Sequence, residues 1–229
     1  MAKSPRASKN PWADAISHLH SADPALGSLM TRVGPCSIRP KVRKDRFATL
    51  VRAIIGQQIS SKAAASIDAR LRDLTSQPHT PEPLIALGET GLRSVGLSGV
   101  KARYVLNLAE AVRSGDVPLD LIHKWDDEAI ITRLTTIKGV GVWTAEMFLI
   151  FALGRPDVFP VGDLGVRAGL RDHYGLPDLP KPQAAVSLGD IWRPYRSVAS
   201  WYLWRSLDPQ YKILANPASI DDPKASAMQ

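Results

Sequence analysis

The sequence is almost without cysteine, because Cys36 is the only one among 229 residues. A single cysteine excludes a disulfide within the chain and any metal or iron–sulfur centre built from several thiolates. The five histidines are scattered, at His18, His20, His79, His123 and His173. Because the first two are two residues apart, they do not share a helical face. The composition therefore gives no reason to expect a metal ion in the chemistry or an organic cofactor.

Long hydrophobic runs are also missing. The longest unbroken apolar run, Met147 to Leu153, is far too short to cross a bilayer. The first ten residues are polar and basic, and no apolar core of a signal peptide follows them. We therefore expect an intracellular protein, in the cytoplasm or nucleoid, with no membrane partner. Residues 1–10 and 216–229 are interpreted as disordered tails around a core at 11–215.

Alternating apolar and polar residues, which indicate half-buried strands, do not recur, and no fixed-period repeat is evident. Apolar residues instead recur at helical spacing. The predicted helices span residues 11–20, 24–32, 45–55, 61–74, 81–87, 90–95, 99–113, 126–134, 142–153, 163–174, 183–192 and 194–207. The segment 142–153 is apolar nearly all round and is predicted to be a buried central helix. The sequence thus predicts an all-α protein.

Acidic residues are the minority charge, with 22 Asp and Glu against 29 Lys and Arg, which gives a formal net charge of +7. This moderate basic bias is compatible with a polyanionic partner but does not identify one.

A glycine pair marks the most informative segment, residues 134–145. Gly139 and Gly141 stand between an apolar periodic run and a second apolar run, which is the pattern of a tight helix–turn–helix hairpin. Glycine accepts backbone angles that other residues avoid and lets another backbone come close. The N–H groups that open the second helix have no partner within it, and such a helix N-terminus suits a phosphate. Alone, the pair could be a simple turn.

An acidic residue, Asp163, follows the hairpin at the end of a segment that contains Pro160 and Gly162 and precedes another predicted helix. The simplest interpretation is an N-cap, a position that aspartate fills well. A carboxylate placed there could also stabilise an oxocarbenium-like transition state or activate water beside a bound sugar. Spacing alone favours the cap.

The hairpin, the Gly/Pro-rich loop and the aspartate together resemble the helix-hairpin-helix base-excision DNA glycosylases, in particular their 3-methyladenine DNA glycosylase II (AlkA-type) branch. The resemblance runs from about Arg46 to Leu207. Its pieces are residues 52–60 (RAIIGQQIS), 96–103 (GLSGVKAR), the hairpin, 159–163 (FPVGD) and 192–197 (WRPYRS). It implies two helical lobes with a DNA-binding cleft between them, faced by the hairpin and Asp163. No N-terminal β-rich domain is expected.

The resemblance implies a mechanism. Asp163 matches the family's catalytic aspartate. Bifunctional relatives carry a lysine directly before the position of Thr144, where this chain has Trp143, and Lys138 lies inside the turn instead. We therefore expect a monofunctional enzyme that uses water and leaves an abasic site.

The resemblance also assigns DNA contacts. Gln58 matches the residue that fills the gap left by the extruded nucleotide, and Gly139, Gly141 and Thr144 match the phosphate-binding hairpin. In relatives, hairpin carbonyls also hold a monovalent cation, Na⁺ or K⁺, here those of Thr135, Ile137 and Val140. The expected partner is damaged double-stranded DNA, bound by a monomer.

The base pocket can be argued from the aromatic residues. They make up only 7% of the chain, yet Trp201, Tyr202 and Trp204 lie in one short segment. A flipped base is held between aromatic or apolar faces. Trp143 and Trp204 match family pocket positions, whereas Trp201 and Tyr202 are left open between pocket and core. Glu146 either lines the pocket or faces a polar groove or an arginine.

An electron-rich pocket would favour a base made cationic by alkylation. Together with this preference, the resemblance implies excision of 3-methyladenine and 7-methylguanine, with hypoxanthine and ethenoadenine as further candidates. Two alternatives remain at this point: a glycosylase for uracil or an oxidised base on the same fold, and a DNA-binding module without catalytic activity.

Overall fold

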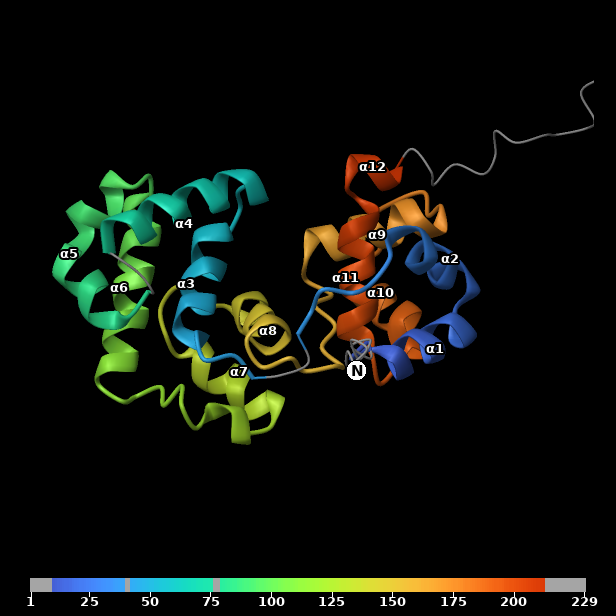
Figure 1. The fold of residues 1–229 in the computed structure, drawn as a ribbon, viewed down its shortest axis with the longest axis horizontal. Helices are drawn as coiled ribbons and strands as arrows, with labels where there is room; N and C mark the ends of the chain where they lie inside the picture. Colours follow the sequence, from blue (N-terminus) through green and yellow to red (C-terminus); the bar gives the residue numbers. More distant parts are fainter. Residues whose placement is uncertain (1–9, 40–41, 76–78, 213–229) are drawn as a thin grey trace, which may run out of the picture. The chain divides into compact units, whose positions relative to one another are not determined.

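The computed structural model describes residues 10–39, 42–75 and 79–212, and its regular structure is helical (Figure 1). None of the described residues forms a strand, which confirms the predicted all-α class. The chain divides into two compact units, one formed from residues 1–37 and 159–229 and the other from residues 38–158. These are the two expected lobes. Within the described ranges, no helix is long and apolar enough to span a membrane.

The unit of residues 38–158 is built around a central helix, α3 (Arg46–Gly56), which packs against α4, α6 and α8 (Figure 1). The apolar residues of α3 at helical spacing, among them Leu50, Ile54 and Ile55, are fully buried, which explains its central place. The other helices of this unit are α4 (Ser61–Thr75), α5 (Pro81–Ser94), α6 (Gly99–Arg113), the 3₁₀ turn η1 (Ile122–Lys124), α7 (Asp127–Thr135) and α8 (Val142–Phe151).

The other unit is built around α11 (Arg196–Ser206), which packs against α2 and α9 (Figure 1). Its remaining helices are α1 (Ala13–Ala22), α2 (Pro24–Val33), α9 (Leu164–Tyr174), α10 (Pro182–Gly189), the 3₁₀ turn η2 (Asp190–Trp192) and α12 (Pro209–Lys212). At Gly169, a Cβ atom would lie 2.6 Å from the Leu203 carbonyl oxygen, so glycine is required for the close approach of α9 and α11.

A buried carboxylate, Asp23, joins three elements of this unit. It accepts hydrogen bonds from the Leu26 N–H at 3.0 Å, from the Trp192 indole at 2.9 Å and from the Tyr174 hydroxyl. Burial alone would raise the pKa of Asp23, but these hydrogen bonds outweigh burial and hold the pKa below its ordinary value. The ionised carboxylate therefore acts as a common acceptor for α2, α9 and η2.

Several predicted helix boundaries differ from the structure. The first helix begins at Ala13 rather than Pro11, because Asn10 closes a turn through its side chain and carbonyl, which accept the N–H groups of Trp12 and Ala13. The predicted helices 81–87 and 90–95 form one element, α5, with a kink at Gly88, whose φ is +61°. The segment 183–192 ends as a 3₁₀ turn. The predicted tails lie outside the described residues, apart from Asn10.

Candidate DNA-binding and catalytic residues

The predicted hairpin is present between α7 and α8. The Val140 N–H donates to the Ile137 carbonyl at 2.9 Å and closes the turn. Gly139 has a φ of +105°, in the left-handed region that favours glycine, whereas Gly141 is the N-cap of α8 with a φ of −93°. Gly141 and Val142 are exposed, and the first N–H groups of an α-helix have no carbonyl partner within the helix. This is the geometry of an anion-binding helix N-terminus.

Helix α6 packs against the hairpin and supports it through two of its side chains. The Tyr104 ring packs so closely on Gly139 that a Cβ there would lie 2.1 Å from Tyr104 Cγ. The Asn107 side-chain amide donates to the Lys138 carbonyl at 3.0 Å. Glycine is therefore required at position 139 for two independent reasons, its positive φ and the close contact with the Tyr104 ring.

Gln57, at the end of α3, completes this support. Its Nε2 donates to the Gly139 carbonyl at 3.0 Å and to the Thr144 hydroxyl at 3.1 Å. Thr144 is only 1% exposed. The Thr144 side chain therefore helps to hold the hairpin to α3, and the predicted phosphate contact of Thr144 stays a prediction.

The candidate wedge, Gln58, follows directly and is exposed. Its φ of +56° makes it the one non-glycine residue of positive φ in the described chain. The Lys101 ammonium donates to the carbonyls of Ile55 and Gln57, at 2.8 and 2.5 Å, and so satisfies the C-terminal end of α3. Burial lowers the pKa of Lys101 below its ordinary value.

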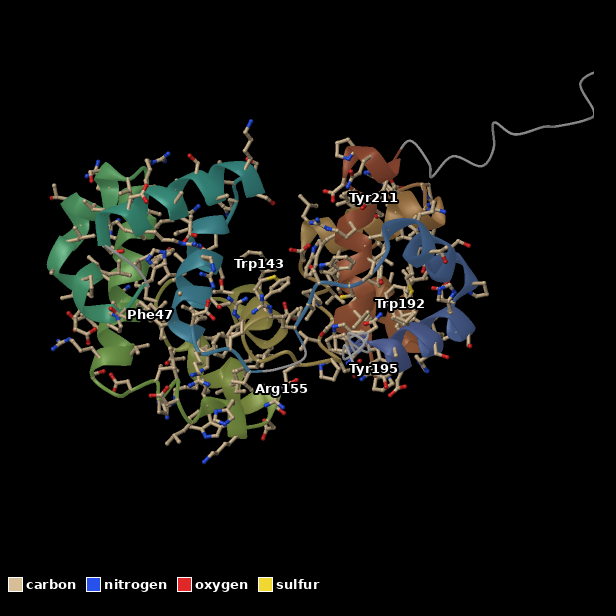
Figure 2. The ribbon with its side chains drawn as sticks, in the orientation of Figure 1. Phe47, Trp143, Arg155, Trp192, Tyr195 and Tyr211 are labelled. Atoms are coloured by element: carbon tan, nitrogen blue, oxygen red, sulfur yellow. The ribbon has the colours of Figure 1, made fainter. Side chains whose placement is uncertain are left out.

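Trp143 lies in the first turn of α8, half-buried (Figure 2). It lines a pocket of about 360 Å³, a volume within the range of small-molecule sites. The pocket is lined by Arg43, Thr49, Arg52, Ala53, Gly56, Trp143, Met147 and Phe151. Glu146, one turn further along α8, is half-buried and is not among these lining residues.

Two arginines of this pocket share one carboxylate. Arg43 contacts Asp45 through two hydrogen bonds, at 2.6 and 2.7 Å, and Arg52 reaches Asp45 at 3.1 Å. The hydrogen bonds from Arg43 hold the pKa of Asp45 well below its ordinary value. The shared ion pairs fix both guanidinium groups, so the polar rim of the pocket is ordered next to its aromatic and apolar wall.

Asp163 is the N-cap of α9, which confirms that part of the sequence interpretation. Its Oδ1 accepts the Val166 N–H at 2.7 Å and the Trp204 indole N–H at 2.8 Å. A Cβ at Gly165 would lie 2.9 Å from Trp204 Cδ1 and 3.0 Å from this Oδ1. Glycine at 165 therefore leaves the space in which the indole reaches the carboxylate.

The remaining aromatic candidates separate by burial. Tyr202 is 1% exposed and its hydroxyl donates to the Gly34 carbonyl at 2.9 Å, so its side chain packs in the core. Trp201 is half-buried, with the Arg205 guanidinium 5.7 Å from the centroid of its ring. Trp192 is fully buried and Tyr195 lies near the start of α11 (Figure 2).

The hairpin carbonyls can be tested as cation ligands. The Ile137 carbonyl already accepts the Val140 N–H, but a carbonyl has two lone pairs and can still bind a cation. Oxygen donors of this kind suit hard cations. Backbone carbonyls are thus suitable donors, and the cation site at Thr135, Ile137 and Val140 stays a prediction. Among the described residues, no three His, Cys, Asp or Glu side chains gather as metal ligands would.

Residues 51–194 match the family described as HhH-GPD superfamily base excision DNA repair protein. The protein therefore belongs to the HhH-GPD superfamily of base-excision DNA repair proteins.

Within this superfamily, the chain is similar to proteins described as 3-methyladenine DNA glycosylases. The chain is 36% identical to DNA-3-methyladenine glycosylase 1 of Schizosaccharomyces pombe over 195 residues, which cover 82% of this chain and 85% of that protein. The solved structure of 3-methyladenine DNA glycosylase from the same yeast, in complex with abasic DNA, matches with a TM-score of 0.79 and 36% identity over 84% and 96% of the two chains. DNA-3-methyladenine glycosidase of Bacillus halodurans matches with a TM-score of 0.71 and 32% identity, over 86% and 91%.

Sequence reasoning missed four residues that support the site: Gln57, Lys101, Tyr104 and Asn107. The last three are spaced by three along α6, so helical periodicity places them on one face. Nothing in the sequence shows that this face meets the hairpin and the end of α3, because that contact depends on tertiary packing.

Proposed function

We propose that the protein is a monofunctional DNA glycosylase that extrudes alkylated purines from duplex DNA and excises them hydrolytically. The observation that carries this proposal is Asp163, a carboxylate held at the start of α9 by the Val166 N–H and the Trp204 indole. The family and the DNA-3-methyladenine glycosylase relatives support the reaction class.

The proposed reaction cleaves the bond between the base and the sugar. As the base leaves, positive charge develops on the sugar, and a fixed carboxylate stabilises this charge or orients the attacking water. A base alkylated at a ring nitrogen is cationic and leaves readily, so strong general-acid assistance is not needed. The product is the free base and an abasic site in an intact strand.

The residue before Thr144 supports the monofunctional assignment. An amine there could attack the sugar and form a Schiff base, whereas the indole of Trp143 is no nucleophile. Trp143 instead offers a π face to the pocket, and a cationic base gains about 0.5–2 kcal/mol from such a contact. Damaged duplex DNA is the proposed partner, bound by a monomer, with the hairpin N–H groups on a phosphate and Gln58 in the gap.

The test is base release from DNA that carries 3-methyladenine, 7-methylguanine, hypoxanthine, ethenoadenine or uracil. We expect the wild type to release the alkylated purines. The Asp163→Asn variant should release none of these bases at a rate comparable with that of the wild type. Preferential release of uracil would replace the proposed specificity, and no release of any base would support a DNA-binding module instead.

The monofunctional assignment has its own assay. Borohydride reduction during turnover should trap no covalent protein–DNA adduct, because no Schiff base forms. A trapped adduct, or strand cleavage beside the abasic site, would contradict the assignment even if base release occurs.

A further inference from the structure

The end of α3 joins the candidate wedge to the candidate phosphate grip. The Gln57 side chain donates to the Gly139 carbonyl and the Thr144 hydroxyl of the hairpin. The Gln57 carbonyl belongs to the peptide bond that precedes Gln58. Gln57 therefore has its side chain fixed by the hairpin and its backbone placed directly next to the wedge.

Lys101 fixes that backbone. Its ammonium, reaching from the first turn of α6, donates to the Gln57 carbonyl at 2.5 Å and to the Ile55 carbonyl at 2.8 Å. The start of α6 is itself fixed, because the Ser98 hydroxyl caps it by accepting the Lys101 N–H. A cation at the C-terminal end of α3 is also favoured by the helix dipole.

Gln58 needs this support because its φ of +56° is one that non-glycine residues rarely adopt. Such a conformation persists only where its surroundings impose it. A hollow of about 230 Å³ lies at this corner, lined by Gln57, Gln58, Ile59, Gly96, Ser98 and Lys101 among others. The space beside Gln58 is therefore not filled by packed side chains, and hydrogen bonds rather than packing hold the turn.

We propose that Lys101 is a positioning residue for nucleotide extrusion, which holds the 57–58 peptide so that Gln58 enters the duplex while the hairpin holds the phosphate. This inference rests on the proposed function. It assigns Lys101 no contact with DNA, and it makes the lysine important only where a base pair must be opened. A direct phosphate contact would instead matter for all DNA alike.

The experiment compares one lesion in two forms. DNA methylated with radiolabelled methyl groups is offered as duplex or after heat denaturation, and single-turnover release of 3-methyladenine is measured. Lys101→Met keeps the apolar stem and removes the donor. Loss of two charge-assisted hydrogen bonds predicts release from duplex slowed about tenfold, with far less effect on denatured DNA. Lys101→Arg should restore part of the duplex rate.

Two further variants complete the design. Lys124→Met, at an exposed lysine of η1, loses the same charge and should leave both rates near wild type. Gln58→Ala should show the duplex-specific loss of Lys101→Met, and the double variant should be no slower than Gln58→Ala alone, because both remove one function. Affinity for undamaged duplex should be unchanged by Lys101→Met.

Equal losses on duplex and denatured DNA, multiplicative losses in the double variant, or weaker binding of undamaged duplex would each overturn the positioning role. If the wild type releases 3-methyladenine and Lys101→Met releases it from duplex DNA equally fast, this inference is wrong but the proposed function stands. A wild type that releases no base from either form overturns the proposed function and this inference with it.

Discussion

Gly139 and Gly141 are two residues apart in the sequence, yet their surroundings differ. Gly139 combines a φ of +105° with an aromatic ring in the place of a Cβ atom. Gly141 has a φ of −93°, and a Cβ there would meet nothing within 4 Å. The fold therefore requires glycine at position 139 but leaves room for a larger residue at position 141.

This difference gives a matched pair of variants. Gly139→Ala should lower the free energy of unfolding by about 2–3 kcal/mol, because backbone strain and a steric clash add. Gly141→Ala should cost less than about 1 kcal/mol but weaken duplex binding to all sequences alike, because a methyl group would crowd a phosphate. Urea denaturation and binding titrations measure both effects. Equal stability losses would contradict the structural distinction.

Trp204 has two candidate roles, a stacking face for the base and a hydrogen-bond donor to Asp163. Trp204→Phe keeps an aromatic ring and removes the N–H. If positioning of the carboxylate dominates, kcat should fall about tenfold with little change in KM, because a hydrogen bond to a charged group is lost. Trp125→Phe, at the tryptophan that follows η1, serves as the control. A raised KM at unchanged kcat would instead indicate that stacking dominates.

Among the helices, α9 shows how capping and chemistry share one side chain. Asp163 accepts the Val166 N–H and so satisfies an N-terminal donor of α9. Asparagine caps a helix about as well as aspartate, whereas alanine does not. The capping bond and the proposed catalytic charge can therefore be removed separately.

We expect Asp163→Asn to abolish base release with stability close to wild type, and Asp163→Ala to abolish release and lose about 1 kcal/mol of stability. Thermal unfolding of the three proteins, beside the release assay, measures this. An asparagine variant as unstable as the alanine variant would show that the charge, rather than the cap, stabilises α9.

The helices also show where sequence patterns suffice. The predicted helix 99–113 matches α6 residue for residue, because its apolar periodicity is a local signal. The sequence predicts two short helices where the structure has the single element α5, which is kinked at Gly88. The 3₁₀ turn η1 was missed, since three residues carry no periodicity.

For the molecule as a whole, the composition predicts a basic protein, the helical spacing of apolar residues predicts an all-α fold, and the family resemblance implies two lobes. The structure shows two helical units. The unit that carries Asp163 is held partly by the buried carboxylate of Asp23, which is 5% exposed and bonded to Tyr174 and Trp192. Burial, and then the Asp23 charge, raise the pKa of Tyr174 above its ordinary value, so the hydroxyl stays a donor.

The lowered pKa of Asp23 predicts a pH-dependent stability. A carboxylate with a lower pKa in the folded state contributes stability above its unfolded pKa of about 3.9, and this is lost as the pH falls through the folded-state pKa. Asp23→Asn should therefore be less stable than wild type by about 2 kcal/mol at neutral pH, and the difference should shrink below about pH 4. Denaturation at several pH values measures it, and a difference independent of pH would contradict the assignment.

The sequence by itself determined the helical class, most helix positions, the glycine hairpin, the Asp163 cap and the tryptophan before Thr144. These follow from periodicity, capping and the identity of single residues, all of which are local. Trp201 and Tyr202 could not be separated in this way, because both are aromatic and adjacent.

Only the tertiary structure decided which side chains meet. It buried Tyr202 against Gly34, brought the Trp204 indole to Asp163, and placed Tyr104 where Gly139 has no Cβ atom. It also brought the Lys101 ammonium to the carbonyls of Ile55 and Gln57, which lie 46 and 44 positions away along the chain. It placed the Gln57 side chain against Gly139 and Thr144, which lie 82 and 87 positions away. Such contacts depend on how helices pack, and packing is set by the whole core rather than by any one segment.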